Sequence, residues 1–374
     1  MSQQPVTRGR RTVTRGGSLG HRALGVATGL VIDRLLGDPP DAWHPVAWFG
    51  TAMGRVEQRL YADAHLPGAA YAFVGVGIGT GSGWLLHRLA GALPGRGSAP
   101  VAGAVAGAVA IACAGRMLRQ TSARIEDRLR VEDLDGAREL LPWLVGRDPS
   151  TLGASGVSAA VVESLAENTV DAVVAPVFWG LVAGAPGVLA HRAVNTMDAM
   201  VGHRSARYAR FGTAAARLDD VMAWVPARVF AALVAVLATL SPSGTPRSAE
   251  RLARPRSAER FALARLRRVV AVVRRDAPAH PSPNSGVAES AVAAALGVEL
   301  GGPLRYGDRV EDRPRLGDGP RPDPSTIRAA RQLVDRVEVA ALATCGVLAA
   351  VASVRTRRTR RSTPYRLDLS RSRR

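Results

Sequence analysis

ESLAENTVDAVVAP (residues 163–176), HRAVNTMDAMVGH (191–203) and FGTAAARLDDVMAWVPAR (211–228) are the segments that decide the fold. They place carboxylates, amides and arginines directly beside apolar runs. Such groups are costly in lipid, so polar residues at the edges of apolar segments mark a candidate functional site. The segments therefore predict a membrane protein whose chemistry lies at the ends of its apolar helices.

Three acids stand at helical spacing in the first of these segments. Glu163, Glu167 and Asp171 lie at i, i+4 and i+8, which places them on one helical face that leads into the apolar run 172–190. Like charges at this spacing repel by about 0.2–0.5 kcal/mol per pair on an exposed helix, and by more near low-dielectric surroundings. The pattern predicts a cation between them, either a divalent metal ion or arginine.

Apolar residues are concentrated in blocks although the chain carries a net charge of +19. Most of these blocks approach the roughly 20 residues that a bilayer span requires. We therefore expect an all-α, polytopic integral membrane helix bundle with polar loops that carry the site. The alternative is a soluble helical protein with core helices rich in Ala, Val and Gly. The blocks are 69–86, 99–115, 172–190, 229–240 (extendable back to 221) and 337–354, with a shorter one at 23–32.

Glycines recur at helical spacing in two of the blocks. Gly75, Gly79 and Gly83 share one face, and Gly103 and Gly107 form a second small-residue pair. Both patterns are typical of close helix–helix contacts in membranes.

All 50 basic side chains are arginines, which excludes a phosphate loop built on lysine. Any anionic substrate must then be held by arginine, whose planar fork suits carboxylate and phosphate. Cys113 and Cys345 both lie in apolar blocks, so neither a disulfide framework nor a cysteine metal site is expected. Few aromatic residues accompany the charge, so we expect no nucleic-acid partner. Arginines beside apolar blocks are typical of anchors on anionic lipid surfaces.

The chain divides into one membrane-embedded domain, residues 21–354, between two basic tails, 1–20 and 355–374. A linker is predicted at 241–260, where PRSAER occurs twice. The polar segment 119–150 is typical of an amphipathic helix pair broken near Gly136 and Pro142. Residues 307–325 are predicted to be a loop.

Two polar connections are further candidates. In the first, residues 29–50, Asp33, Asp38 and His44 either line a site or belong to a capping turn with Trp43 and Trp48 at the membrane interface. The second, residues 280–286, opens a helix at 287–296 that Gly297 closes. A polar loop at a helix N-terminus is either an anion site or an ordinary capped turn.

The chain resembles the membrane-bound adenosylcobinamide-phosphate synthase family of cobalamin assembly from about residue 20 to 350. Five matched blocks, in order, carry this resemblance. They are Asp33, Gly37-Asp38-Pro39 and His44-Pro45; Glu163-Ser164, Ala166-Glu167-Asn168, Asp171 and Pro176; Arg192, Asn195-Thr196, Asp198 and Met200; Phe211-Gly212, Ala216-Arg217, Asp219-Asp220 and Pro226-Ala227-Arg228; and Pro281-Ser282-Pro283-Asn284, Gly286, Glu289 and Leu296-Gly297. His191 stands where the family tends to have tyrosine, and Val287-Ala288 where it commonly has Trp-Pro.

The resemblance implies ATP-dependent amide formation between adenosylcobyric acid and aminopropanol or aminopropanol phosphate, with Mg²⁺ as cofactor and ATP as co-substrate. We expect a multi-pass protein of the cell membrane that acts on corrinoid and aminoalcohol substrates beside other membrane-associated cobalamin-assembly enzymes. The expected catalytic residues are Glu163, Glu167, Asn168 and Asp171. Mg²⁺ is expected on Glu167, Asp171, Asp219 and Asp220. Substrate binding is expected from Arg192, Asn195, Asp198, Arg217, Arg228, Ser282, Asn284, Asp38 and His44.

Two other classes of membrane protein share some of these features. A transporter or carrier also has acids at the membrane edge and broken helices, although the charges here lie mainly at segment ends and in loops. A membrane alcohol phosphotransferase would need a second spaced aspartate pair after Asp219-Asp220, which the sequence lacks.

Two rules give conflicting predictions for the topology. Basic tails prefer the cytoplasm, so an even number of spans is expected and 20–36 must cross. That arrangement would place 119–171 and 242–336 outside, away from ATP. An ATP-using enzyme instead requires these loops inside, with some segments re-entrant.

Overall fold

The computed structural model describes residues 15–92, 99–146, 148–203, 205–240, 255–306 and 309–361, and it confirms the all-α prediction. The predicted tails and linker fall partly outside these residues, at 1–14, 241–254 and 362–374. The described parts of the predicted tails and linker are helical: α1 begins at Arg15, α10 begins at Pro255 and α12 ends at Arg361.

Twelve α-helices are described, with short turns and one two-stranded hairpin. The helices are α1 (Arg15–Leu36), α2 (Pro45–Leu60), α3 (His65–Ala92), α4 (Ala99–Ala112), α5 (Gly115–Arg130), α6 (Leu134–Leu140), α7 (Ala154–Thr169), α8 (Ala175–Met197), α9 (Thr213–Leu240), α10 (Pro255–Asp276), α11 (Ser285–Leu296) and α12 (Pro324–Arg361). Two π-helical turns flank α8, η3 (Val170–Val174) and η4 (Asp198–Gly202), and 3₁₀ turns cover Asp41–Trp43, Leu141–Trp143 and Ala277–Ala279.

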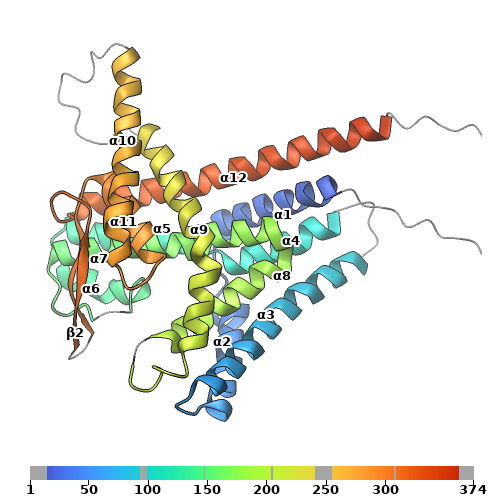
Figure 1. The fold of residues 1–374 in the computed structure, drawn as a ribbon, viewed down its shortest axis with the longest axis horizontal. Coiled ribbons are helices and arrows are strands. Elements are labelled where there is room, and N and C mark those ends of the chain that lie inside the picture. Colours follow the sequence, from blue (N-terminus) through green and yellow to red (C-terminus); the bar gives the residue numbers. More distant parts are fainter. Residues whose placement is uncertain are drawn as a thin grey trace, which may run out of the picture.

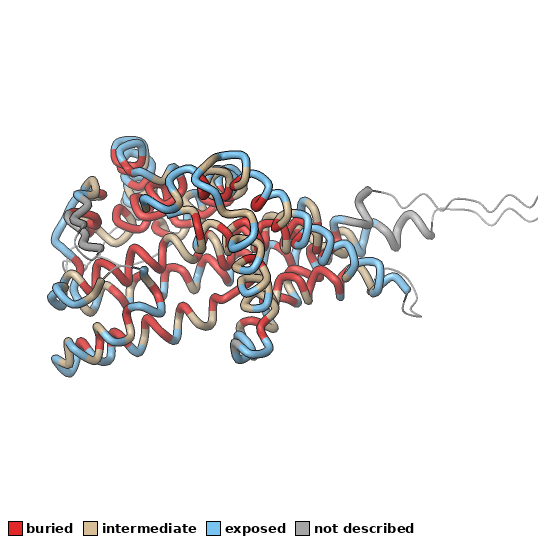
Figure 2. Tube along the Cα trace, turned by 90° about the horizontal axis from the view of Figure 1, so that it is seen from below, coloured by how far each residue is buried: buried red, intermediate tan, exposed pale blue. Residues whose placement is uncertain are grey.

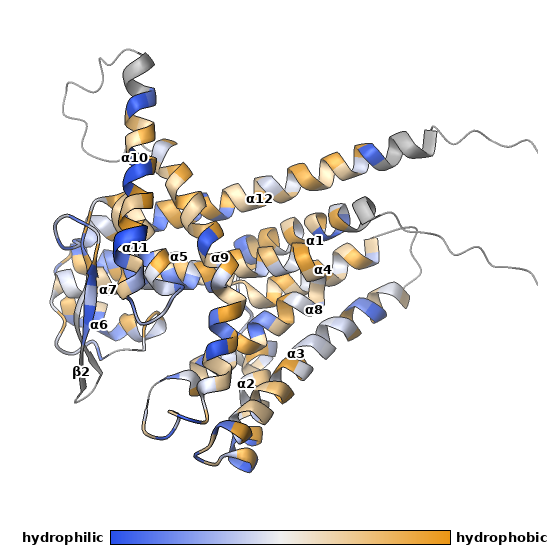
Figure 3. Ribbon diagram, in the orientation of Figure 1, coloured by the Kyte–Doolittle hydropathy of each residue, from blue (hydrophilic) through white to orange (hydrophobic). Residues whose placement is uncertain are grey.

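The helices form two regions, as Figure 1 shows. In the first, which we call the apolar bundle, α1, α3, α4, α8 and the C-terminal part of α12 run toward one end; α1 contacts α4 and α12, and α8 contacts α3 and α4. In the second, α5, α6, α7, α11 and the hairpin gather at the other end, while α9 crosses between the regions and contacts both α8 and α11. Apolar residues dominate the bundle (Figure 3), and buried residues line the interior of both regions (Figure 2).

Five segments are long and apolar enough to cross a membrane, which confirms a multi-pass helical membrane protein. Helix α1 is not among them, although residues 20–36 were expected to cross. Two of the five contain a break: the segment Ala99–Arg130 changes helix at Cys113, and Ala154–Gly202 reverses direction. The other three are His65–Ala92, Thr213–Leu240 and Pro324–Arg355.

The apolar segment 172–190 is not one straight span, because α8 is a re-entrant hairpin, which fits the topology with re-entrant segments. Gly184 has φ 68° and ψ −155°, outside the helical region, and Pro186 follows it. A side chain at Gly180 would meet Val188 at 3.4 Å, so the two limbs lie side by side. A straight helix would separate residues 171 and 195 by about 36 Å, yet Asn195 Nδ2 lies 3.1 Å from Asp171 Oδ2. The chain therefore enters the bundle and returns to the same end.

Replacement of Gly184 by alanine is expected to destabilise this hairpin. A backbone at φ 68° and ψ −155° is open almost only to glycine, and forcing another residue into such a region costs about 1–3 kcal/mol. Thermal unfolding of the detergent-purified chain measures the loss. Gly81→Ala is the matched control, because Gly81 lies in α3 with nothing within 4 Å of an added Cβ. Equal unfolding temperatures for the two variants would contradict the reversal at Gly184.

The predicted glycine face of α3 packs against the return limb of α8. An added Cβ at Gly79 would lie 2.6 Å from the Leu189 carbonyl oxygen, and one at Gly83 would lie 2.5 Å from Pro186 Cα. The second predicted glycine surface is wrong: Gly103 has nothing within 4 Å and Gly107 only a leucine methyl at 3.8 Å. Helix α4 packs instead on Gly29 of α1, whose Cβ would meet Val109 at 2.6 Å.

Two local predictions need correction in the second region. The loop predicted at 307–325 begins with a strand, since β1 (Leu300–Tyr306) pairs antiparallel with β2 (Arg309–Leu316). The predicted pair at 119–150 breaks at residues 131–133, and Gly136 lies inside α6, where its N–H is capped by Asp133. The helix expected at 287–296 is confirmed as α11, closed by Gly297 in the left-handed conformation.

Candidate active site

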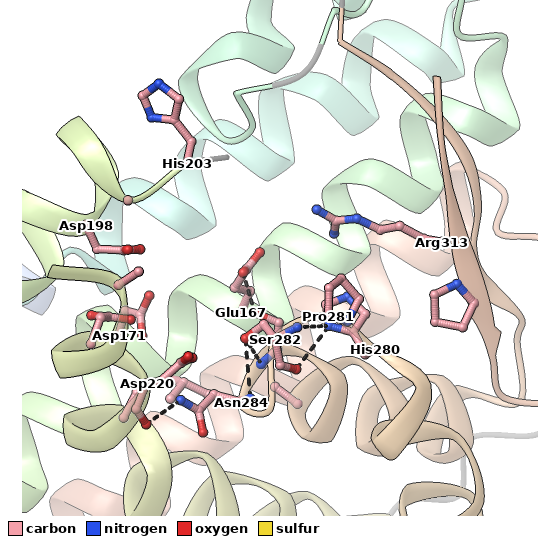
Figure 4. A pocket seen from close by; sticks show the side chains of 18 of the residues that line it. Glu167, Asp171, Asp198, His203, Asp220, His280, Pro281, Ser282, Asn284 and Arg313 are labelled. Carbon is pink, nitrogen blue, oxygen red and sulfur yellow. Dashed lines mark hydrogen bonds between the residues drawn. The ribbon is translucent and has the colours of Figure 1, made fainter. Parts of the chain in front are cut away.

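A cavity of about 1030 Å³ lies where the two regions meet. It is bounded by the end of α7 and η3, by η4, by the first turns of α9, by the loop before α11 and by β2. Figure 4 shows Asp171, Asp198 and Asp220 on one side of this cavity, Arg313 and His280 on the other, and Glu167 between them. Residues distant in the sequence thus converge on one space.

The re-entrant hairpin brings the carboxylates together. Its outward limb follows Asp171 and its return limb ends at Asp198, so both acids stand at its mouth. Asn195, on the return limb, donates from Nδ2 to Asp171 Oδ2 at 3.1 Å and to Asp219 Oδ1 at 3.5 Å. One amide group therefore joins the hairpin to α9 through two carboxylates.

Glu167 connects this acidic wall to the loop before α11. Ser285 Oγ donates to Glu167 Oε1 at 2.5 Å. Hydrogen bonds to an ionised acceptor are shorter and stronger than neutral ones. Glu167 and Ser285 both line the cavity, so the pair presents an oriented carboxylate to whatever binds there.

The loop 280–286 is a capped turn whose side chains line the cavity. Ser282 Oγ accepts from the Asn284 and Ser285 N–H groups at 3.4 and 3.2 Å. Asn284 donates from Nδ2 to the Asp220 carbonyl at 2.8 Å and accepts from Arg228 Nη1 at 2.8 Å. These backbone N–H groups are thus bonded within the loop, and Asn284 fastens the loop to α9.

Acidic groups dominate the charged lining of the cavity. Six carboxylates line it, against the guanidinium of Arg313 and two histidines. Burial lowers the pKa of His280, so its ring is neutral near pH 7. Its Nδ1 lies 3.1 Å from both the backbone nitrogen and the carbonyl oxygen of Ser282, and its Nε2 lies 3.7 Å from Glu289 Oε1. The cavity therefore favours cations. The six acids are Glu167, Asp171, Asp198, Asp219, Asp220 and Asp312.

A second, polar cavity of about 140 Å³ shares Glu167 and Arg313 with the first. Glu163 and Asn168, predicted to be catalytic beside Glu167, line this smaller space instead. Glu163 Oε1 accepts from the Gly301 N–H at 2.8 Å, and Asn168 donates to Ser164 Oγ at 2.7 Å. The Glu163 bond holds α7 to β1, whereas the Asn168 bond lies within α7, where Ser164 in turn donates to the Leu144 carbonyl at 2.9 Å.

Several predicted binding residues do not line the large cavity. Arg217 is exposed on α9, and Arg228 holds Asn284 and the Pro283 carbonyl. Arg192 borders a separate apolar cavity. Asp38 lies 3.4 Å from His44 Nε2, while His44 Nδ1 accepts from Val46 N–H and caps α2. For Asp38 and His44 the capping alternative fits this geometry.

No group of three or more Asp, Glu, His or Cys side chains in the described part of the chain is close enough to form a metal site by itself. Mg²⁺ usually needs only one or two protein carboxylates and takes its other ligands from water and phosphate oxygens. The acidic donors around the cavity suit that mode of binding, and Asp171 and Asp219 already share a donor in Asn195. The Mg²⁺ ligand set stays a prediction.

Several lining residues were absent from the predicted site, among them His280, Ser285, Asp312 and Arg313. His280 and Ser285 flank the predicted loop residues, and a hydroxyl at the start of a helix is a signal that would have found Ser285. Asp312 and Arg313 belong to β2, in a segment predicted to be a loop, and no motif marks them.

Comparison with known proteins gives a consistent result along the chain. The family described as CobD/Cbib protein matches residues 26–334. The protein named cobalamin biosynthesis protein CobD of Mycobacterium tuberculosis (strain H37Rv) is 44% identical over 327 residues, which cover 87% of this chain and 95% of that protein. Proteins of the same name from Rhizobium meliloti and Rhodobacter capsulatus are 39% and 36% identical, with 78% and 81% of this chain covered and 85% and 88% of theirs.

No solved structure matches the chain significantly. The family match nevertheless covers both regions of the fold and every element around the cavity, from η3 to β2. Relatives more than a third identical cover over three quarters of the chain. The chain therefore belongs to the CobD/Cbib family.

Proposed function

We propose that the protein is a cobalamin-biosynthesis enzyme of the cell membrane that joins a corrinoid carboxylate to aminopropanol or aminopropanol phosphate at the expense of ATP. The observation that carries this proposal is the acidic cavity of about 1030 Å³ at the mouth of the re-entrant hairpin. Its size is at the upper end of the range for small-molecule sites. The names of the relatives support cobalamin biosynthesis as the pathway.

The reaction requires an activated carboxylate. A carboxylate does not condense with an amine in water, so ATP must first convert it to a better acyl donor. Mg²⁺, when bound, would neutralise charge on the phosphates of ATP, and one or two carboxylates from Glu167, Asp171, Asp219 and Asp220 would hold it. This fit rests on the surplus of acids around the cavity.

The residues of the chain supply orientation and charge. Asn195 keeps Asp171 and Asp219 together, and Ser285 fixes Glu167. An ammonium group is attracted to this surplus of carboxylates, and one of them takes the proton that the amine must lose. Arg313, as the guanidinium at the cavity wall, would face the anionic groups of the substrates.

A membrane carrier is the competing function, because the acids also lie beside a broken apolar helix. The match to a family whose curated members are named for cobalamin biosynthesis favours the enzyme. The acids also stand at the mouth of the hairpin and not along it, so they do not form a path through the bundle.

The test is a reaction with the detergent-purified full chain. With adenosylcobyric acid, aminopropanol or its phosphate, and Mg²⁺-ATP, we expect amide product and consumed ATP in a one-to-one ratio, measured by mass spectrometry and a coupled ATPase assay. The control omits ATP. Amide formation without ATP, or no amide with either amine, would overturn the proposal.

A further inference from the structure

A third cavity, of about 440 Å³, lies between α2, α3, α4 and the return limb of α8. Most of the side chains around it are apolar, and the single charged residue among the described lining residues is Arg192. Cavities of this size, with an apolar wall and one placed charge, are typical of sites for a ligand with an apolar body and one charged group. The residues that line this cavity are Pro45, Val46, Trp48, Phe49, Ala52, Ile78, Gly79, Ser82, Leu86, Ile111, Leu189, Arg192, Ala193 and Thr196.

Arg192 makes few hydrogen bonds to the protein, although the carboxylates of Asp171 and Asp38 lie near enough to act on its charge. Its Nη1 donates one long hydrogen bond, 3.4 Å, to Asn195 Oδ1. Its Nε is buried and has no hydrogen-bond partner among the described residues. Leaving a buried charged donor without a partner is costly. The guanidinium is therefore suited to an anionic ligand group at its end of the cavity.

The cavity lies at the lipid-facing side of the bundle. Helix α3 belongs to a candidate membrane span, and the side of it that borders the cavity is apolar and exposed: Ile78, which lines the cavity, is 40% exposed, and Leu89, on the same side, is 58% exposed. Trp48 on the rim is 55% exposed, with its indole N–H bonded to the Ala42 carbonyl. Exposed tryptophans of this kind are enriched at the boundary between lipid and water.

Along its length the cavity changes from charged to apolar. Arg192 and Thr196 lie toward the mouth of the hairpin. Ser82 lies beside Pro186, near the tip of the hairpin, and Leu86 lies one helical turn further along α3. An arginine and an exposed tryptophan on one cavity, with an apolar slot leading away from the arginine, match a phospholipid in shape and charge. The phosphate would meet the guanidinium and one acyl chain would fill the slot.

We propose that this cavity binds an anionic phospholipid of the surrounding bilayer, with its phosphate on Arg192 and one acyl chain between α2, α3 and α8. The site is distinct from the acidic cavity, where no phospholipid phosphate would be favoured next to six carboxylates. The net charge of +19 adds a general attraction to anionic lipid. Binding at this site does not depend on the reaction proposed above.

Quenching of Trp48 fluorescence by brominated lipids tests the proposal. The full chain is reconstituted in phosphatidylcholine vesicles that contain increasing fractions of brominated phosphatidylglycerol or brominated phosphatidylcholine. The difference between the parent and Trp48→Phe isolates the signal of Trp48 among the six tryptophans. One arginine at an anionic surface predicts an enrichment of about fivefold, so half-quenching is expected at an about fivefold lower fraction of brominated phosphatidylglycerol.

Three variants decide the outcome. Arg192→Gln should remove the about fivefold part of the preference for the anionic lipid that this arginine contributes, whereas Arg88→Gln, an α3 arginine that stacks on Trp84 outside the cavity, should retain it. Ser82→Phe fills the slot from an exposed position and should reduce quenching by both lipids. Equal quenching by both lipids in the parent, or an unchanged preference in Arg192→Gln, would show ordinary lipid contact only and overturn the proposal. If Arg192→Gln does not fold, unchanged quenching in Ser82→Phe still overturns it.

Discussion

Glu167→Gln is expected to reduce the rate of amide formation by roughly 10² or more, the usual effect of removing one well-placed charged group from a transition state. Glutamine keeps the shape and still accepts the hydrogen bond from Ser285 Oγ. The variant therefore loses the charge while the contact between α7 and the α11 loop is retained. The rate is measured as kcat for amide product, with protein folding checked by thermal unfolding in detergent.

Two matched variants serve as comparisons for this result. Glu163→Gln makes the same change one helical turn earlier, at a residue that lines the small polar cavity and accepts from Gly301 N–H, so a smaller loss is expected. Asp135→Asn makes the change at an exposed carboxylate on α6 and should leave kcat unchanged. If Glu167→Gln turns over at the parental rate, Glu167 does not act in the reaction, and the role of the acidic cavity fails with it.

The sequence predicted the helices, and most of the segments that line the acidic cavity, because both depend on local patterns. Apolar blocks give the candidate spans, and the glycines of α3 gave a correct packing face. The glycine pair of α4 gave an incorrect one, since spacing alone does not say which neighbour covers a face. The reversal of α8 had a local signal in Gly184, Pro186 and Gly187, which a reading by hydropathy alone passes over.

The composition of the site was less predictable, since it depends on which ends of helices meet. Asp171, Asp198 and Asp219 are grouped because the hairpin returns to its starting level. Arg192 lies six residues before Asp198 and yet borders another cavity, because the two face different sides of the return limb and its π-helical end. Arg313 enters the site from a strand that no sequence pattern marked.

The second large effect is expected from Asn195→Asp. In the parent, one amide group donates to both Asp171 Oδ2 and Asp219 Oδ1, and so joins the hairpin to α9. An ionised aspartate has no donor and places a third negative charge between the two. An uncompensated buried charge costs about 3–5 kcal/mol, and Arg192, whose Nη1 donates to Asn195 Oδ1, would offset part of that cost here. The variant should therefore lose part of that unfolding free energy and, with the carboxylates displaced, most of its amide-forming activity.

Thermal unfolding in detergent, with and without Mg²⁺, measures the effect and separates its causes. If the three carboxylates share a divalent cation, Mg²⁺ should restore part of the lost stability in Asn195→Asp, and this readout needs no catalysis. Gln58→Glu makes an amide-to-acid change at an exposed position on α2 and controls for added charge alone. An Asn195→Asp variant that unfolds at the parental temperature and remains active would mean that the bonds from Asn195 do not hold the acidic cluster together, and that packing against the neighbouring helices, α3 and α9 among them, fixes the hairpin at its mouth.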